Sequence, residues 1–293
     1  MRSAAAKIYR KRRIALKGQV VKSHGSEYFV KSGEETFRLV ARGKMKGKTE
    51  ILVGDNVEFA NGAISCVLPR VSRFVRPSVA NVELIAAVLS AQPKPDFLML
   101  DKLLVSAEKE GVEVIFVVNK NDLGEEIYEK VEKEYKGAGI EVFSVSAEQG
   151  VNLGALKNRL KGRLTAFAGQ SAVGKSSLVN AMFGTSLKVG DLSVIGRGRH
   201  TTTFSNIYTF GEWKIVDTPG FAVLETDMDE TELARYYPEF EAHLNECKFR
   251  GCLHAGEPDC AIAELARNGE ISPERYQRYL EILKQLKERK KYE

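Results

Sequence analysis

A glycine-rich loop in the second half of the chain has the residue types that bind phosphate. Residues 169–176 fit the pattern Gly-x-x-x-x-Gly-Lys-Ser, follow the apolar run 164–168 and precede a helix-compatible stretch, 177–183. The glycines let several backbone N–H groups face the phosphates, and the helix N-terminus adds its positive end. Lys175 is expected to reach the β- and γ-phosphates, and the Ser176 hydroxyl is expected to bind Mg²⁺. The phosphate-binding candidates are Gly169, Gln170, Ser171, Ala172, Val173, Gly174, Lys175, Ser176 and Ser177.

A second motif, Asn-Lys-Asn-Asp at residues 119–122, selects the base. It follows the apolar run 112–118, and doubly wound sheets bind their ligands at the ends of strands. A carboxylate only accepts hydrogen bonds, so Asp122 can accept from N1–H and N2–H₂ of guanine together, a donor pair that adenine lacks. The Lys120 stem can lie on the base, and a backbone N–H near Ala147 can donate to guanine O6. The guanine-site candidates are Asn119, Lys120, Asn121, Asp122, Ser146 and Ala147.

Two later segments contain residues that would complete a magnesium and γ-phosphate site. Asp217 ends an apolar strand, and a carboxylate at this position in phosphoryl-transfer sites holds Mg²⁺, usually through water. Gly220 would sense the γ-phosphate through its N–H. The Gly- and Arg-rich segment 196–203 predicts a mobile loop, of which one threonine would join the Mg²⁺ shell, and a plain surface loop is the alternative. The magnesium candidates are Ser176, Asp217 and either Thr202 or Thr203.

Three cysteines and a histidine near the C-terminus have the spacing of a metal site, Cys-x₄-Cys-x-His-x₅-Cys, with Gly251 and Gly256 at the bends. Four nitrogen and sulfur ligands without an open position predict one tetrahedral, structural zinc ion. His243, one helical turn before the first cysteine, is a rival donor, and free buried thiols are the other alternative. The fourth cysteine, Cys66, is expected to be a core residue. The predicted zinc ligands are Cys247, Cys252, His254 and Cys260.

The nucleotide motifs need a scaffold, and the middle of the chain predicts one. Apolar runs typical of strands buried on both faces alternate with segments of helical spacing. This alternation predicts an α/β fold with a parallel sheet and helical crossovers. The expected strands are 82–90, 112–118, 141–145, 164–168 and 214–216, and the expected helices are 97–107, 125–135, 153–160 and 177–183.

The flanking parts of the chain predict two smaller units. Five short strands with glycine-marked turns predict a small β-barrel, with an OB-fold favoured over an SH3-like barrel, followed by a linker at 69–77. After Gly220 we expect helices, and in the last one Ser272 is the N-cap and Pro273 the first residue. The division is therefore 1–70 barrel, 71–225 nucleotide domain and 226–293 zinc-binding helical domain. Barrel strands are expected at 18–23, 27–31, 35–41, 53–59 and 63–68, and C-terminal helices at 230–244, 262–267 and from 273.

The order of the motifs is unusual, because the guanine motifs precede the phosphate loop and Asp217 comes last. The same sheet results if the chain is circularly permuted, since the termini of a domain often lie close together. With the Gly-Arg-His-Thr-Thr-Thr loop at 198–203, the barrel and the Cys/His module, nearly the whole chain resembles the ribosome small subunit-dependent GTPase A family. The resemblance implies hydrolysis of GTP to GDP and phosphate, stimulated by the small ribosomal subunit. It also implies binding to that subunit and its rRNA during late maturation.

One residue departs from Ras-like enzymes. Phe221 stands where a water-positioning glutamine would be, and an apolar side chain cannot orient a nucleophile. The resemblance assigns His200 a catalytic role instead, and contact with RNA or solvent alone is the alternative. A second functional class is a GTP-gated rRNA-binding scaffold in which hydrolysis is incidental. Asp122 opposes a third class, a P-loop ATPase or kinase.

Composition and charge agree with a nucleotide-dependent RNA-binding protein. The chain has 293 residues, of which 43% are hydrophobic and 28% charged, as in globular proteins. Its apolar runs fall short of the roughly 20 residues of a membrane helix, and neither a secretory signal nor membrane binding is expected. Cysteines with metal-ligand spacing favour a reducing cytoplasm, and a monomer is expected. The net charge is +5, with basic clusters at 1–17, 38–48 and 284–291. Any one of these clusters is more typical of a solvated, flexible tail, but three of them beside a nucleotide site favour a polyanion such as RNA.

Overall fold

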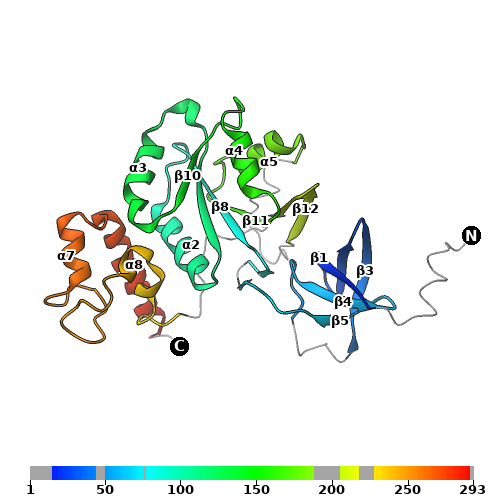
Figure 1. The fold of residues 1–293 in the computed structure, drawn as a ribbon, viewed down its shortest axis with the longest axis horizontal. Coiled ribbons are helices and arrows are strands. Elements are labelled where there is room, and N and C mark those ends of the chain that lie inside the picture. The colour runs from blue at the N-terminus through cyan, green and yellow to red at the C-terminus, as the bar shows by residue number, and fades with distance from the viewer. Residues whose placement is uncertain (1–14, 44–49, 76, 188–204, 218–227, 291–293) are drawn as a thin grey trace, which may run out of the picture.

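The structure, a computed structural model, describes residues 15–43, 50–75, 77–187, 205–217 and 228–290. Three units follow one another: a β-barrel, a central α/β sheet and a helical unit that contains the clustered cysteines (Figure 1). The central sheet lies between the other two units, so both flanking modules adjoin the part that carries the nucleotide motifs.

The N-terminal unit is a closed five-stranded barrel of the predicted kind. It closes because the first strand pairs with both the second and the fourth, while the third and fifth pair in parallel. Val20, Val30, Val57 and Ile64 fill the interior and are fully buried. The strands are β1 (Leu16–His24), β2 (Glu27–Ser32), β3 (Glu35–Ala41), β4 (Asn56–Ala60) and β5 (Ala63–Val67).

The expectation that Cys66 is a core residue is wrong, because its side chain is exposed. Strict alternation after the buried Ile64 would turn Cys66 inward. A register shift intervenes: Ile64 lies opposite Phe59, but Cys66 lies opposite Glu58, so one extra residue is inserted in β5. Such a bulge moves the following side chain to the other face of the strand.

The central sheet has the strand order β10-β9-β8-β11-β13-β12. All of its neighbours are parallel except β12, which runs antiparallel to β13 at the edge. Every residue of β8 is buried, as the continuous apolar run predicts for a strand covered on both faces. The unpredicted strand is β12. The strands are β8 (Leu84–Leu89), β9 (Glu113–Val118), β10 (Glu141–Ser144), β11 (Leu164–Ala168), β12 (Asn206–Phe210) and β13 (Trp213–Asp217).

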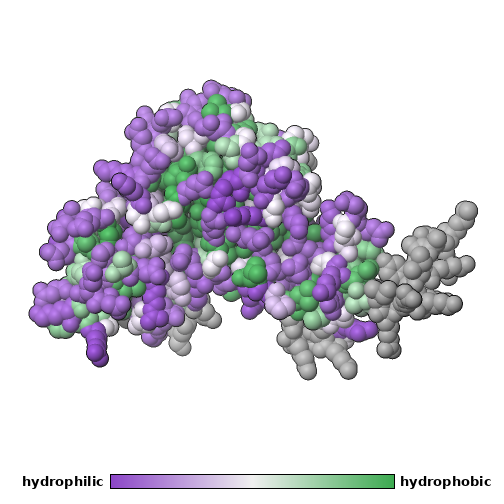
Figure 2. All heavy atoms as spheres, in the orientation of Figure 1, coloured by the Kyte–Doolittle hydropathy of each residue, from purple (hydrophilic) through white to green (hydrophobic). Residues whose placement is uncertain are grey.

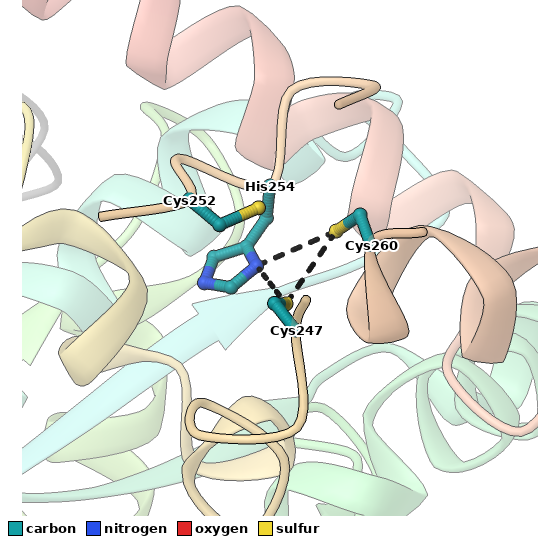
Figure 3. Close-up of side chains that lie close together, drawn as sticks. All are labelled: Cys247, Cys252, His254 and Cys260. Atoms are coloured by element: carbon teal, nitrogen blue, oxygen red, sulfur yellow. Dashed lines mark hydrogen bonds between the residues drawn. The ribbon is translucent and has the colours of Figure 1, made fainter. Parts of the chain in front are cut away.

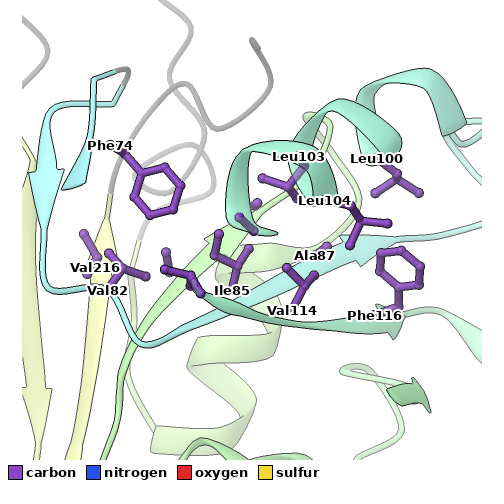
Figure 4. Packing of buried hydrophobic residues seen from close by; sticks show 14 of the residues in the cluster. Phe74, Val82, Ile85, Ala87, Leu100, Leu103, Leu104, Val114, Phe116 and Val216 are labelled. Atoms are coloured by element: carbon purple, nitrogen blue, oxygen red, sulfur yellow. The ribbon is translucent and has the colours of Figure 1, made fainter. Parts of the chain in front are cut away.

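Helices cover both faces of this sheet. Leu100, Leu103 and Leu104 of α2 pack on Ile85 and Phe116 of the sheet (Figure 4). The opposite face packs against α4 and α5. The parallel sheet with helical crossovers is therefore confirmed. The helices are α2 (Phe97–Lys109) and α3 (Glu126–Tyr135) on one face, and α4 (Leu153–Leu160) and α5 (Lys175–Phe183) on the other.

The barrel and the central sheet are joined more closely than a linker would join them. Lys22 of β1 pairs with Asn206 of β12, so the barrel extends the central sheet. Much of the expected linker is also ordered, because β6 (Arg73–Phe74) pairs with β7 (Val79–Ala80). Phe74 is part of the sheet's hydrophobic core.

The C-terminal unit is helical, but the expected helix over residues 230–244 is wrong. It is divided into a 3₁₀ turn, η4 (Leu233–Tyr236), and a short helix, α6 (Pro238–Glu241). Tyr237 has φ −114° and ψ 99°, because the residue before a proline is driven out of the helical region. In α8 (Pro273–Lys290) the Ser272 Oγ accepts from the Arg275 N–H at 3.3 Å, which confirms the predicted cap. The remaining helix is α7 (Ala261–Asn268).

The face of the molecule in Figure 2 is mostly hydrophilic, with hydrophobic residues scattered between charged ones. Within the described ranges, no helix has the length and apolar character needed to span a membrane.

Candidate nucleotide site and metal centre

The guanine and phosphate motifs meet at one edge of the central sheet. The phosphate loop joins β11 to α5, residues 119–122 follow β9, and Ser146 and Ala147 follow β10. These strands are parallel within one sheet, so their carboxyl ends share an edge, as in other ligand-binding doubly wound sheets.

Asn119 connects two of the motifs. It is 2% exposed; its Nδ2 donates to the Val173 carbonyl at 2.9 Å, and its Oδ1 accepts from the Ala147 N–H at 3.1 Å. A Cβ on Gly174 would lie 2.2 Å from the Asn119 Nδ2, and Gly174 has φ +98°. Only glycine allows the loop to lie this close to Asn119. Asn119 therefore fixes the phosphate loop relative to the Ser146–Ala147 segment.

Asp122 and Lys120 lie on either side of this connection. Asp122 Oδ1 accepts from the Ser146 hydroxyl at 2.6 Å, a positioning role for Ser146 that the sequence analysis missed. Lys120 Nζ donates to the carbonyls of Gln92 at 2.7 Å and Ala172 at 2.9 Å, so its stem extends from the guanine motif to the phosphate loop. The Asn121 N–H donates to Val145 O at 3.1 Å.

The phosphate loop has the compact backbone that its glycines predict. Gly169 has φ +132°, and a Cβ there would lie 2.1 Å from the Val88 carbonyl oxygen. Lys175 is 5% exposed, and its Nζ donates to the carbonyls of Gly169 and Gln170, each at 2.8 Å. Ser176 follows in the first turn of α5 and is buried. A buried ammonium and a helix N-terminus together favour a polyphosphate at this loop.

A further contact of the phosphate loop could not be predicted from the motif. The Gln170 Oε1 accepts from the Asp96 N–H at 3.0 Å. Asp96 is in turn the N-cap of α2, since its Oδ1 accepts from the Met99 N–H at 2.9 Å. The contact joins residues 74 positions apart in the sequence, and neither has a spacing that would reveal it.

The remaining nucleotide-site candidates lie at the limit of the described structure. Asp217 is the last residue of β13, and the preceding Val216 pairs with Ala166 of β11. The backbone of Asp217 therefore lies beside the end of the strand that leads into the phosphate loop. His200, Thr202, Thr203 and Gly220 lie outside the described residues, as does Phe221.

The four predicted metal ligands converge on one point (Figure 3). Their ligand atoms all lie within 4.8 Å of one another. His254 Nδ1 is 3.4 Å from Cys247 Sγ and 3.5 Å from Cys260 Sγ, and the two sulfurs are 3.9 Å apart. Two thiolates, each about 2.3 Å from a tetrahedral zinc ion, would be separated by about 3.8 Å. The residues therefore fit a zinc ion, with Cys252 as the fourth ligand.

Burial favours the neutral forms of the candidate metal ligands. It lowers the pKa of His254, which keeps the imidazole neutral at pH 7, and it raises the pKa of the Cys252 thiol to about 12. The thiol therefore becomes a thiolate only with a compensating cation. The rival donor His243 is not part of this cluster, and its Nδ1 lies 2.7 Å from the Glu246 carboxylate instead. The predicted bends at Gly251 and Gly256 are confirmed by φ values of +75° and +100°.

Together, the fold and the site define a circularly permuted P-loop GTPase with an N-terminal barrel and a C-terminal Cys₃His module. Residues 67–227 match the family model of the RsgA GTPase, and residues 17–63 match that of the RsgA N-terminal domain. The chain belongs to the RsgA GTPase family. The resemblance inferred from the motifs is thereby confirmed, and with it an enzyme of the GTPase class.

Individual relatives match nearly the full length. The small ribosomal subunit biogenesis GTPase RsgA of Ruminiclostridium cellulolyticum is 39% identical over 94% of this chain and 95% of its own. The RsgA protein of Geobacillus thermodenitrificans is 41% identical over 93% of this chain and 98% of its own. The crystal structure of YjeQ from Thermotoga maritima aligns with a TM-score of 0.80 at 35% identity, covering 93% of this chain and 99% of that one. The crystal structure of YloQ, a circularly permuted GTPase, aligns with a TM-score of 0.76 at 30% identity, covering 95% of this chain and 97% of that one.

Proposed function

We propose that this chain binds the small ribosomal subunit, acts in its late maturation, and hydrolyses GTP to GDP and phosphate with stimulation by the subunit. The relatives described above are small ribosomal subunit biogenesis GTPases of nearly the same length. The observation that carries the proposal is the convergence of Asp122, Asn119 and Lys175 at one sheet edge. In the proposed site, the Asp122 carboxylate at this edge selects guanine and the adjacent loop binds the phosphates.

In the proposed site, each residue has a separate role. Asp122 accepts from N1–H and N2–H₂ of guanine, and the Ala147 N–H donates to O6. Lys120 lies along the base, and Lys175 binds the β- and γ-phosphates. The bound Mg²⁺ ion neutralises charge on the phosphates. Its proposed ligands are Ser176, Asp217 and Thr202 or Thr203, with the Gly220 N–H on the γ-phosphate and His200 in catalysis.

The two flanking modules would bind rRNA. The barrel interior has a cluster of its own, whereas the C-terminal cluster also includes Val105 of α2, and one cluster of the central sheet also includes Val53. We propose the domains 1–70, 71–225 and 226–293, with these residues packing across the domain limits. The basic clusters of the sequence at 1–17, 38–48 and 284–291 favour contact with RNA phosphates. A monomeric state and a cytoplasmic location complete the proposal.

Sedimentation with purified small subunits tests the binding half of the proposal. The chain should sediment with the subunit more tightly with a non-hydrolysable GTP analogue than with GDP. The comparison is made at matched salt, because phosphate contacts depend on ionic strength. The Lys175→Ala variant is the control, since it should lose the difference between nucleotides. Failure to sediment in either nucleotide state would contradict the proposal.

A further inference from the structure

Helix α8 contacts two different parts of the molecule through neighbouring residues. The Tyr276 hydroxyl donates to the backbone carbonyl of His254 at 2.9 Å, and the Tyr279 hydroxyl donates to that of Leu253 at 2.6 Å. Arg275 and Arg278 of the same helix contact the GTPase unit instead. The loop that carries a metal ligand and the GTPase unit are therefore bound to one rigid element.

Both arginines converge on Asp101 of α2, which is fully buried. Arg275 Nη1 donates to Asp101 Oδ1 at 2.6 Å, and Arg278 Nε donates to Oδ2. The Tyr135 hydroxyl also donates to Oδ1, at 2.7 Å. Arg275 is 1% exposed. We call this set the Asp101 network; its other members are Glu134, which accepts from Arg278 at 3.0 Å, and Glu239, which accepts from Arg275.

Such a network contributes little net stability, but it defines the relative positions of its helices precisely. The free-energy cost of removing several charges from water offsets most of their mutual attraction. Apolar residues of similar size at the same positions often stabilise a protein equally well. Charged groups with directional hydrogen bonds instead favour the one arrangement of their helices in which these bonds form. The Asp101 network joins α2 and α3 of the GTPase unit to α6 and α8 of the C-terminal unit. It therefore fixes how the two units pack.

The N-terminal end of α2 contacts the phosphate loop. Asp96 caps the helix five residues before Asp101, and its N–H donates to the Gln170 side chain at 3.0 Å. Hydrogen bonds and two helices thus connect His254, a candidate zinc ligand, with Gln170 of the phosphate loop. A connected set of rigid elements of this kind can transmit a change in packing between two sites.

We propose that Asp101 is a positioning residue that couples the metal centre to the phosphate loop. Zinc orders the loop that Tyr276 and Tyr279 contact and so fixes α8. Through Asp101, α8 holds α2 where Asp96 contacts Gln170. Because coupling between two binding sites is reciprocal, zinc raises the affinity for nucleotide by the same factor by which nucleotide raises the affinity for zinc. The inference rests on the proposed nucleotide site.

Equilibrium competition for zinc with a coloured chelator measures this coupling without reference to turnover. The full-length, zinc-loaded protein is compared with and without saturating GDP, and the ratio of the two zinc dissociation constants is the readout. We expect GDP to lower the zinc dissociation constant by at least about fivefold in the wild type. In Asp101→Asn the ratio should approach one. The matched control is Arg159→Gln, which breaks an ion-pair cluster of α4 with Glu113 and Glu141 and should keep the wild-type ratio.

The outcomes separate this inference from the proposed function. A wild type that does not bind GDP overturns both. GDP binding without any effect on zinc affinity overturns the coupling alone, as does an unchanged ratio in folded Asp101→Asn. Should that variant fail to fold, Arg278→Gln and Gln170→Ala interrupt the same connection at positions that are less buried than Asp101. Wild-type ratios in both variants would overturn the inference.

Discussion

The Ser146 hydroxyl donates a 2.6 Å hydrogen bond to Oδ1 of Asp122, across 24 residues of sequence. Ser146 Oγ also accepts from the Gln149 N–H at 3.1 Å, so the hydroxyl is itself held in place. The two guanine motifs are thus a single hydrogen-bonded unit. This contact orients the carboxylate that would select the base.

Replacing Asp122 by Asn should weaken GTP binding roughly 10- to 100-fold, because hydrogen bonds to a charged acceptor are worth about 1.5–3 kcal/mol. The amide can donate where the carboxylate only accepted, so the variant should gain affinity for xanthine nucleotides. Titration with fluorescent GDP and XDP measures both effects. The Ser146→Ala variant, which keeps the Asp122 carboxylate but removes its hydrogen-bond donor, should weaken GTP binding only severalfold. Unchanged GTP affinity in Asp122→Asn would mean that the base binds elsewhere.

Lys175→Ala and Ser176→Ala should abolish GTP turnover, since they remove the phosphate contact and a magnesium ligand. The Ser176 variant should keep the circular dichroism spectrum and melting temperature of the nucleotide-free wild type. Steady-state phosphate release and thermal melts test the two statements. Wild-type turnover in both variants would remove the phosphate-loop assignment.

Gly174→Ala should reduce both stability and GTP affinity. The new Cβ would need space now occupied by the Asn119 Nδ2 at 2.2 Å, in addition to the strain of φ +98°. Gly184→Ala is a matched control with φ +64° and open space around its Cβ position. Left-handed backbone alone costs about 1–2 kcal/mol, so Gly174→Ala should lose more than the control in urea unfolding. Equal losses would show that the Asn119 contact is unimportant.

The protein should contain one equivalent of zinc, and its removal should melt the C-terminal unit before the GTPase unit. Cys252→Ala should have the same effect as chelation. Because burial raises the pKa of Cys252 to about 12, zinc binding at pH 7 must displace a proton, and zinc affinity should fall as the pH is lowered. Elemental analysis and calorimetry in buffers of different ionisation enthalpy measure these quantities. Zinc-free protein of wild-type stability would contradict the assignment.

Sequence patterns predicted the elements whose determinants are local. The helix 153–160 and the strand 164–168 have the predicted limits, because their apolar spacing lies within the segments. The phosphate loop and the Cys₃His cluster were predicted for the same reason, since their chemistry depends on short spacings.

The remaining features depend on partners distant in sequence. Cys66 is exposed because of a bulge that only the pairing with β4 reveals. The contact between Gln170 and Asp96 and the convergence of two arginines on Asp101 require the folded packing of α2 and α8. The break at Pro238, in contrast, could have been predicted, because proline disfavours helix in the residue before it.

GTP turnover with and without small ribosomal subunits is the most direct test of the central claim. Phe221 cannot orient the attacking water, so the chain alone should hydrolyse GTP slowly. Small subunits should increase the rate strongly, Ser176→Ala should abolish the stimulation, and large subunits should not replace small ones. Equal rates with and without small subunits, despite tight GTP-dependent binding, would contradict the account and favour a GTP-gated scaffold.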